Sequence, residues 1–337
     1  MHIFREVRVL KDEDRPVTFQ EEGSTRTLVI SIYYRAFPDQ SDMNDLGMKY
    51  SELFQPCEQR AMGILKDIGM NMELLDSCIT HVRPSKFPQK LSGTCPVIIY
   101  SPALGLDRDM YMYNIEELVK QGSVVITISA SHEAMFTILP TGEFVEQSEA
   151  MRLIGSTNYP ALHHLVSIRK KDIQFLLDYL PALNATDDTF IGCLELDKII
   201  VAGHSLGGIA SLEIALQDDR IQACILLDPS MHLFREENMK GGNRPLTLLL
   251  QQEASNLEQL IPKLGEELTD KFIEGQERVS RTLAGIGEFI KVHNASHMTF
   301  SDLPLFEEDL VLANTTRKTH NIINNAIIRF LEYGGMA

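Results

Sequence analysis

The sequence contains no tryptophan and only five cysteines in 337 residues. The cysteines are dispersed and include no C-x-x-C pair, which excludes a disulfide framework and a cysteine zinc site. Two of them, Cys95 and Cys224, begin apolar runs, so we expect them to be small core residues. The cysteines therefore indicate core positions rather than a covalent staple or a metal site.

Long apolar runs are also absent, and none approaches the roughly 20 residues that a membrane-spanning helix requires. The opening residues, MHIFREVRVLKDED, carry charges early and lack an apolar centre, so we expect no signal peptide. The expected location is cytoplasmic, or secreted only if a leader segment was removed ahead of this sequence.

Basic residues are scarce, because 31 Lys and Arg stand against 47 Asp and Glu, a formal net charge of -16. A surface of that sign repels phosphate backbones, which argues against nucleic acid as a partner. It also disfavours electrostatic docking on anionic lipid, although it leaves weak hydrophobic contact with a lipid interface open. The charge leaves the oligomeric state undetermined.

Short apolar runs alternate with segments of helical spacing through most of the chain. Ahead of them, REVRVL and PVTFQEE-GS-TRTLVISIYY predict an antiparallel hairpin with a Gly-Ser turn. The pattern predicts an α/β fold, with a mostly parallel sheet of about eight strands and helices on both faces. No linker or repeat interrupts it, so residues 1–337 are expected to form one domain. The expected core strands are CPVIIYS (95–101), SVVITIS (123–129), DKIIVAGHS (197–205), ACILLDP (223–229), PLTLLLQQ (245–252) and EFIKVHN (288–294).

The segment VAGHSLGG (201–208) contains a G-x-S-x-G pentapeptide between an expected strand and an expected helix. A nucleophile elbow requires this setting, because its sharp turn lifts the serine hydroxyl above the edge of the sheet. Gly203 and Gly207 suit the turn, since larger side chains there would clash with the adjoining strand or helix. Ser205 is therefore the candidate nucleophile. The alternative is a glycine-rich turn in which Ser205 only caps the following helix.

A serine hydroxyl needs a base to take its proton and a buried carboxylate to orient that base. In hydrolases with this elbow, the acid follows the serine along the chain and the histidine follows the acid. Asp228 stands at the carboxyl end of the next strand, in ILLDP, which opens onto the same edge as Ser205. Glu253, which follows the strand PLTLLLQQ, is the alternative, and strand position favours Asp228 over it.

Two histidines, four residues apart in FIKVHNASHMTFSD, compete for the role of base. His297 lies in the loop past the last expected strand, where an imidazole can reach between Ser205 and Asp228. His293 still lies inside the apolar run, where the pleat of the strand fixes its direction. We therefore expect His297 to be the base and His293 to be a structural or supporting residue.

Acyl transfer also requires hydrogen-bond donors for the oxyanion of the tetrahedral intermediate. One is expected to be the backbone N–H of Leu206, the residue after the candidate nucleophile. The other should come from the loop after an earlier strand, here SPALGLD, in which Leu104 is the candidate. The alternative is that SPALG is an ordinary turn.

Several separate blocks of this sequence resemble, in the same order, the platelet-activating-factor acetylhydrolase family of α/β-hydrolases, both its plasma-type members (group VII phospholipases A2) and their microbial relatives. The resemblance runs from about residue 26 to residue 305 and implies a catalytic triad and an oxyanion hole. Among its blocks are RTLVISIYYRAF, VIIYSPALGLDRDMY, SASHEAMF, RKKDIQFLLDYL, DKIIVAGHSLGG, QDDRIQACILLDPSM and SHMTFSDLPLF. Carried over residue by residue, it implies Ser205 as nucleophile, Asp228 as acid, His297 as base, and the amides of Leu104 and Leu206 as oxyanion donors.

This chain departs from the family in two places near the acyl site. The usual S-H-G-L-G loop reads S-P-A-L-G here, with Pro102 and Ala103. The tryptophan that the family often carries just beyond the acid is absent. The family also places the acid after the strand ILLDP rather than after the next strand, which weakens Glu253 as the alternative.

A serine ester hydrolase that uses a Ser-His-Asp triad, and needs no metal or organic cofactor, is the predicted function. The resemblance implies a lipid ester as substrate, a phospholipid with a short or oxidised sn-2 acyl chain. A broad short-chain carboxylesterase acting on small-molecule esters is the alternative, and a non-catalytic binding protein on a hydrolase scaffold is the third hypothesis. The segment 231–287 is expected to shape the mouth of the pocket.

Overall fold

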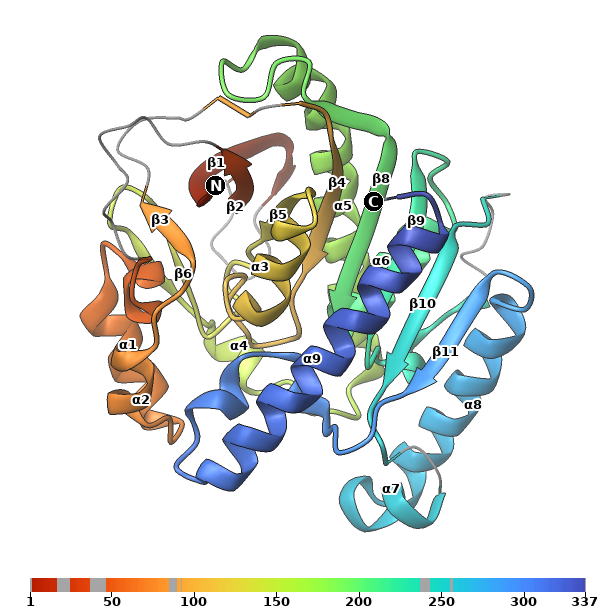
Figure 1. Ribbon diagram of the computed structural model, residues 1–337. Helices are drawn as coiled ribbons and strands as arrows, with labels where there is room; N and C mark the ends of the chain where they lie inside the picture. Colours follow the sequence, from red (N-terminus) through yellow and green to blue (C-terminus); the bar gives the residue numbers. More distant parts are fainter. Residues whose placement is uncertain are drawn as a thin grey trace.

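A computed structural model of the protein describes residues 2–16, 25–36, 47–84, 90–91, 93–236, 243–254 and 257–336. Its central sheet has nine strands among these residues (Figure 1). In spatial order they are β11 (Gly287–Lys291), β10 (Leu246–Gln251), β9 (Ile221–Leu227), β8 (Leu194–His204), β4 (Cys95–Ser101), β5 (Val124–Ile128), β2 (Thr25–Ala36), β1 (His2–Pro16) and β3 (Val82–Pro84).

The sheet is mostly parallel, as expected. The strands from β11 to β5 run parallel to one another, while β2 pairs antiparallel with both β5 and β1. The opening hairpin is therefore confirmed as β1 and β2, although residues 17–24, with the expected Gly-Ser turn, lie outside the described residues. A short two-stranded sheet, β6 (Phe136–Ile138) and β7 (Phe144–Glu146), lies beside the main one.

Helices connect the strands and cover the sheet. Those in the described part of the chain are α1 (Glu58–Asp67), α2 (Met72–Ser77), α3 (Met112–Lys120), α4 (Glu149–Arg152), α5 (Tyr159–Thr186), α6 (Leu206–Ala215), α7 (Leu257–Leu264), α8 (Glu266–Thr282) and α9 (Leu310–Tyr333), with the 3-10 turns η2 (Tyr50–Phe54), η3 (Met231–Leu233), η5 (His297–Phe300) and η6 (Leu303–Phe306). Within these residues, no helix combines the length and the apolar composition that crossing a bilayer demands.

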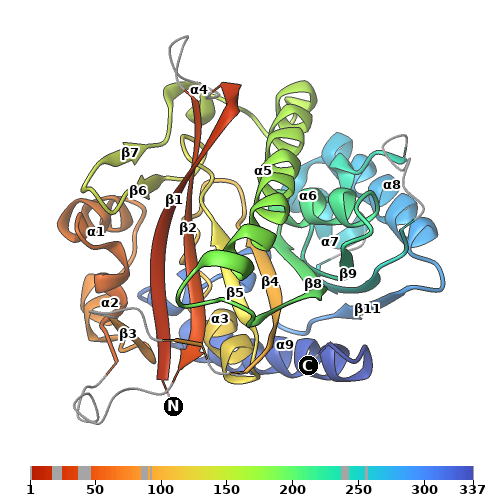
Figure 2. The ribbon, with the colours of Figure 1, turned by 90° about the horizontal axis from the view of Figure 1, so that it is seen from above.

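Both faces of the sheet are covered, which Figure 2 shows from above. Helices α5, α6 and α8 lie on one face, and α3 and α9 lie on the other. Because side chains alternate along a strand, Val97 and Ile99 of β4 join the first core, whereas Ile98 and Tyr100 join the second. This double burial explains why the core strands are continuous apolar runs rather than alternating ones.

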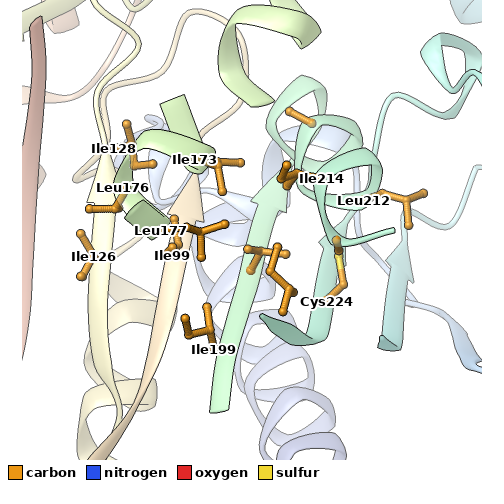
Figure 3. Close-up of a cluster of buried hydrophobic side chains, with 14 of the residues drawn as sticks. Ile99, Ile126, Ile128, Ile173, Leu176, Leu177, Ile199, Leu212, Ile214 and Cys224 are labelled. Carbon is orange, nitrogen blue, oxygen red and sulfur yellow. The ribbon is translucent and has the colours of Figure 1, made fainter. Parts of the chain in front are cut away.

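The core between the sheet and helices α5 and α6 is drawn in Figure 3. Ile173, Leu176 and Leu177 of α5 pack against strand residues such as Ile99 and Ile126, all of them buried. The buried cysteines Cys95 and Cys224 belong to the same core, as expected from the apolar runs that they begin. Helix α6 is buried along its whole length, which holds the turn before it firmly against the sheet.

The last strand ends earlier than expected. The sequence predicts a strand over residues 288–294, but β11 ends at Lys291, whose partner Gln251 is the last residue of β10. In the described sheet β11 is an edge strand with β10 as its neighbour, so its pairing stops where β10 stops. The prediction that His293 lies within a strand is therefore wrong.

Candidate active site

The turn between β8 and α6 carries Ser205 in a strained conformation, with φ 56° and ψ -119°. Positive φ is costly for a residue with a side chain and is held only where the surroundings fix it. The Ser205 side chain makes no hydrogen bond that caps α6, so the alternative of a simple capping serine does not fit. The hydroxyl faces other residues instead.

Two glycines allow this turn, for the reason given by the sequence pattern. A Cβ atom at Gly203 would lie 2.4 Å from the carbonyl oxygen of Gly207. A Cβ atom at Gly207 would lie 2.3 Å from the carbonyl oxygen of Ser101, at the end of β4. Neither distance is tolerable, because the atoms approached belong to the backbone. The glycines therefore pack the start of α6 against both β8 and the loop after β4.

The structure brings Ser205, His297 and Asp228 together at the carboxyl ends of the strands. Nε2 of His297 lies 3.0 Å from Oγ of Ser205, and its Nδ1 lies 2.5 Å from Oδ2 of Asp228. Asp228 and Ser205 are buried, whereas the His297 side chain is 41% exposed. The imidazole thus bridges a buried carboxylate and a hydroxyl, and it faces solvent where a substrate would arrive.

Asp228 is held by the neighbouring strand end. Its backbone N–H donates to the carbonyl of Leu250, and its own φ is 41°. Gln252 donates twice to the carboxylate, from the backbone N–H to Oδ1 at 3.0 Å and from Nε2 to Oδ2 at 2.9 Å. Gln252 was not predicted as part of the site, although it lies directly beside Glu253 at the end of β10.

The two alternative residues are placed away from Ser205. Glu253 accepts a hydrogen bond from the backbone N–H of Asn294, and its Oε1 lies 2.8 Å from Nδ1 of His293. A structural or supporting role for His293 stays a prediction, and its side chain is 86% exposed. The early end of β11 is the reason for this exposure, because it leaves His293 in a solvent-facing turn.

His204, inside the G-x-S-x-G motif, supports the loop of His297, and this role was not predicted from the sequence. Its Nε2 lies 3.0 Å from the carbonyl oxygen of His297, and its Nδ1 lies 3.2 Å from the hydroxyl of Tyr111. That hydroxyl accepts from the N–H of Ala103 at 2.8 Å. Burial, with a contribution from the charge of His297, lowers the pKa of His204 well below its usual range, so it is a neutral connector.

The loop SPALG, which carries Leu104, is anchored on both sides of that residue. The buried guanidinium of Arg169 donates to the carbonyl of Pro102 at 2.9 Å, and the carbonyl of Gly105 accepts from the N–H of Met135. The same carbonyl of Pro102 would lie 2.4 Å from a Cβ atom at Gly207. The loop of Leu104 and the start of α6, where Leu206 stands, are thus in close contact.

A cavity of about 370 Å³ opens beside Asp228 and His297. Helices α7 and α8 supply most of its apolar wall, and both belong to the segment 231–287. In Figure 1, α7 lies at the end of the molecule toward which the arrows of β8 and β10 point. The lining of the cavity includes the apolar Leu260, Leu264, Leu268, Phe272 and Met298, together with the polar His232 and Lys263.

A parallel sheet with a strained serine between strand and helix, followed along the chain by an aspartate and a histidine that meet it, defines an α/β-hydrolase. The chain belongs to the family described as "Platelet-activating factor acetylhydrolase, isoform II", which matches residues 17–332. The protein is therefore a carboxylic ester hydrolase.

A curated relative agrees with this assignment, and a solved structure agrees with the fold. A platelet-activating factor acetylhydrolase of Cavia porcellus is 23% identical over 326 residues, which cover 90% of this chain and 71% of the relative. The solved structure of a ferulic acid esterase from Streptomyces cinnamoneus superposes with a TM-score of 0.73 at 22% identity. That match covers 97% of this chain and 89% of the esterase, and it establishes the fold.

Proposed function

We propose that Ser205, His297 and Asp228 are the catalytic triad of a serine ester hydrolase that cleaves short or oxidised sn-2 acyl groups from phospholipids. The observation that carries the proposal is the continuous chain of contacts from Asp228 through His297 to Ser205, at the side of an apolar cavity. These contacts have the spacing that proton transfer requires.

In the acylation step, Ser205 Oγ attacks the ester carbonyl while its proton passes to Nε2 of His297. Asp228 keeps the Nδ1 proton of His297 pointed away from Ser205 and stabilises the imidazolium that forms. Collapse of the tetrahedral intermediate transfers the Nε2 proton to the leaving alcohol. The acyl group remains as an ester of Ser205.

In the deacylation step, His297 takes a proton from water as the water attacks the acyl carbon. The bond from that carbon to Ser205 Oγ then breaks, His297 returns the proton to Oγ, and the carboxylic acid leaves. Both steps create an oxyanion, for which we assign the backbone N–H groups of Leu104 and Leu206. The close packing of the SPALG loop on the start of α6 supports this pairing. The helix α6 also directs the positive end of its dipole toward this point.

The lining of the cavity supports an acyl lipid as substrate. Leu260, Leu268 and Phe272 offer an apolar wall beside His297, and such a wall favours an acyl chain or a glycerol backbone. Lys263 lines the same cavity and can pair with a phosphate, a feature of note in a chain with a formal net charge of -16. The Cavia porcellus relative is named for the hydrolysis of an acetyl group of platelet-activating factor.

Labelling with a fluorophosphonate tests the assignment of Ser205. The reagent should attach to Ser205 of the native protein and to no other serine, and Ser205→Ala should abolish both labelling and turnover. A folded, active protein that remains unlabelled at Ser205 would overturn the proposal.

A substrate panel tests the lipid assignment against a broad short-chain carboxylesterase. We expect kcat/KM to be higher for a phospholipid with a short sn-2 acyl chain than for p-nitrophenyl acetate or butyrate. Lys263→Met should reduce kcat/KM for the phospholipid and leave the aryl esters nearly unchanged, because only the phospholipid carries a phosphate. Equal losses on both substrates, or a preference for aryl esters in the native protein, would favour the carboxylesterase.

A further inference from the structure

A second serine contacts the proposed nucleophile. Oγ of Ser230 lies 3.2 Å from Oγ of Ser205, on the side of the cavity. Ser230 occupies the position that precedes η3, where a serine side chain ordinarily accepts a hydrogen bond from the helix backbone. Here the Ser230 side chain makes no such capping bond. Its hydroxyl is directed at Ser205 instead.

The direction of this hydrogen bond follows from the protons available. Nδ1 of His297 faces the carboxylate of Asp228 and must carry a proton, so the neutral imidazole accepts at Nε2. The single hydroxyl proton of Ser205 is then donated to Nε2 of His297. Ser230 must therefore be the donor in its contact with Ser205.

The backbone holds Ser230 in place for this contact. Its N–H donates to the carbonyl oxygen of Ser205 at 3.0 Å, so the two residues are joined through main chain as well as side chain. Pro229, just before it, packs on the elbow, because a Cβ atom at Gly208 would lie 3.0 Å from Cβ of Pro229. Both restraints come from backbone and proline, so they would persist if the Ser230 hydroxyl were removed.

We infer that Ser230 is a further catalytic residue, whose hydroxyl donates to Ser205 Oγ and stabilises the negative charge that this oxygen carries in both half-reactions. The inference rests on the proposed role of Ser205. During attack, the Ser205 proton moves to His297 while Oγ becomes partly anionic, so a donor aimed at Oγ strengthens its bond at that moment. Ser230 keeps its own proton throughout.

The same donor acts again when the acyl group leaves. In deacylation, water has added to the acyl carbon and the bond from that carbon to Ser205 Oγ breaks, with the electron pair passing to Oγ. His297 then returns a proton to this oxygen. Between these states the oxygen is an ester oxygen, a poor acceptor, so the Ser230 bond is strongest in the two transition states. Differential stabilisation of this kind raises kcat.

The variants Ser230→Ala and Ser230→Thr test the inference, because the first removes the hydroxyl and the second retains it. Three rate constants are measured: the pre-steady-state burst with p-nitrophenyl acetate, the steady-state turnover that follows, and inactivation by a fluorophosphonate. All three involve Ser205 Oγ. Ser230→Ala should lower each by about tenfold to a hundredfold, and Ser230→Thr should recover most of the loss. The melting temperature of each variant reports folding.

The outcomes separate this inference from the proposal on which it rests. A native protein that the fluorophosphonate does not label at Ser205 refutes the triad. A native protein labelled at Ser205, with Ser230→Ala reacting at the native rates, refutes only the role of Ser230. A change in KM alone would mean that Ser230 only shapes the cavity, and this outcome also refutes its catalytic role. If Ser230→Ala folds poorly, the test rests on Ser230→Thr. A folded Ser230→Thr variant whose three rates are about tenfold to a hundredfold below the native rates refutes the role of Ser230.

Discussion

His293 and Glu253 are hydrogen-bonded to each other, with Nδ1 of the histidine 2.8 Å from Oε1 of the carboxylate. In the sequence, His293 is the alternative to His297 as base, and Glu253 is the alternative to Asp228 as acid. Their pair is solvent-exposed, since the two side chains are 86% and 41% accessible. It stands apart from the pair that His297 forms with the buried Asp228, which faces Ser205.

Substitutions in the pair of Asp228 and His297 should therefore reduce turnover strongly, whereas substitutions in the pair of Glu253 and His293 should hardly change it. Asp228→Asn should lower kcat by about 10⁴-fold, because the histidine would be left in the wrong tautomer. Glu253→Gln and His293→Ala should change kcat/KM by no more than about twofold, since exposed pairs contribute little. Steady-state kinetics on one ester, with melting temperatures as the control for folding, decide the matter. Loss of turnover in His293→Ala with retention in His297→Ala would invert the assignment.

The meeting of Ser205, Asp228 and His297 at the strand ends could be anticipated from the sequence. Ser205 sits in a local motif, and Asp228 and His297 each follow an apolar run, so chain order and strand position were enough to bring them to one edge. The extent of pairing was not predictable in this way. The end of β11 depends on where its neighbour β10 ends, and this contact with Gln251 is not a property of residues 288–294.

Other features could not be predicted from the sequence, because they depend on contacts between distant segments. The strand β3 has only three residues and joins the sheet through β1, almost 80 residues earlier in the chain. Gln252 and Ser230 gain their roles from Asp228 and Ser205, and neither residue type stands out in the sequence. His204 was visible inside the pentapeptide, but its contacts with His297 and Tyr111 require the folded chain.

The His204 connection predicts a positioning effect on the base. His204→Phe would fill a similar volume but remove both hydrogen bonds, and the carbonyl of His297 would lose its buried partner. We expect kcat to fall by about tenfold, because leaving this carbonyl unpaired beside an apolar ring costs about 1–3 kcal/mol and frees the loop of His297. KM should change little, since His204 does not line the cavity. His204→Gln, which retains a hydrogen-bond donor, should recover part of kcat. If His204 were purely structural, both variants would have a lower melting temperature and the same kcat.

Buried histidines predict how stability changes with pH. Burial lowers the pKa of His232 and of His320 to about 4, and that of His204 well below its usual range. The unfolded chain takes up protons near pH 6.5 while these folded imidazoles stay neutral, so stability falls as the pH drops from about 6.5 to about 4. Asp302 works in the opposite sense, because burial raises its pKa to about 7.

A comparison of variants isolates the histidine contribution from that of Asp302. The free energy of unfolding in urea is measured at pH 7.5 and at pH 5 for the native protein and for His320→Gln. The side-chain amide of the introduced glutamine should donate to the carbonyl of Thr299 in place of His320, and it does not titrate. We expect a smaller loss of stability at pH 5 in His320→Gln than in the native protein. An equal or larger loss would show that His320 does not resist protonation.

Gly275 and Gly63, both inside helices, predict opposite effects of the same substitution. A Cβ atom at Gly275 of α8 would lie 2.2 Å from the carbonyl oxygen of Met231 in η3, whereas nothing lies within 4 Å of a Cβ atom at Gly63 of α1. Gly275→Ala should push α8 from η3, cost about 1–3 kcal/mol of stability, and raise KM because Phe272 in the cavity wall shifts. Gly63→Ala should stabilise the protein by about 0.5–1 kcal/mol and leave KM unchanged, because alanine favours the helix. Urea unfolding and steady-state kinetics measure both effects. A Gly275→Ala variant that is as stable as Gly63→Ala and has an unchanged KM would contradict this prediction. The packing of α8 on η3 would then not determine the position of the cavity wall.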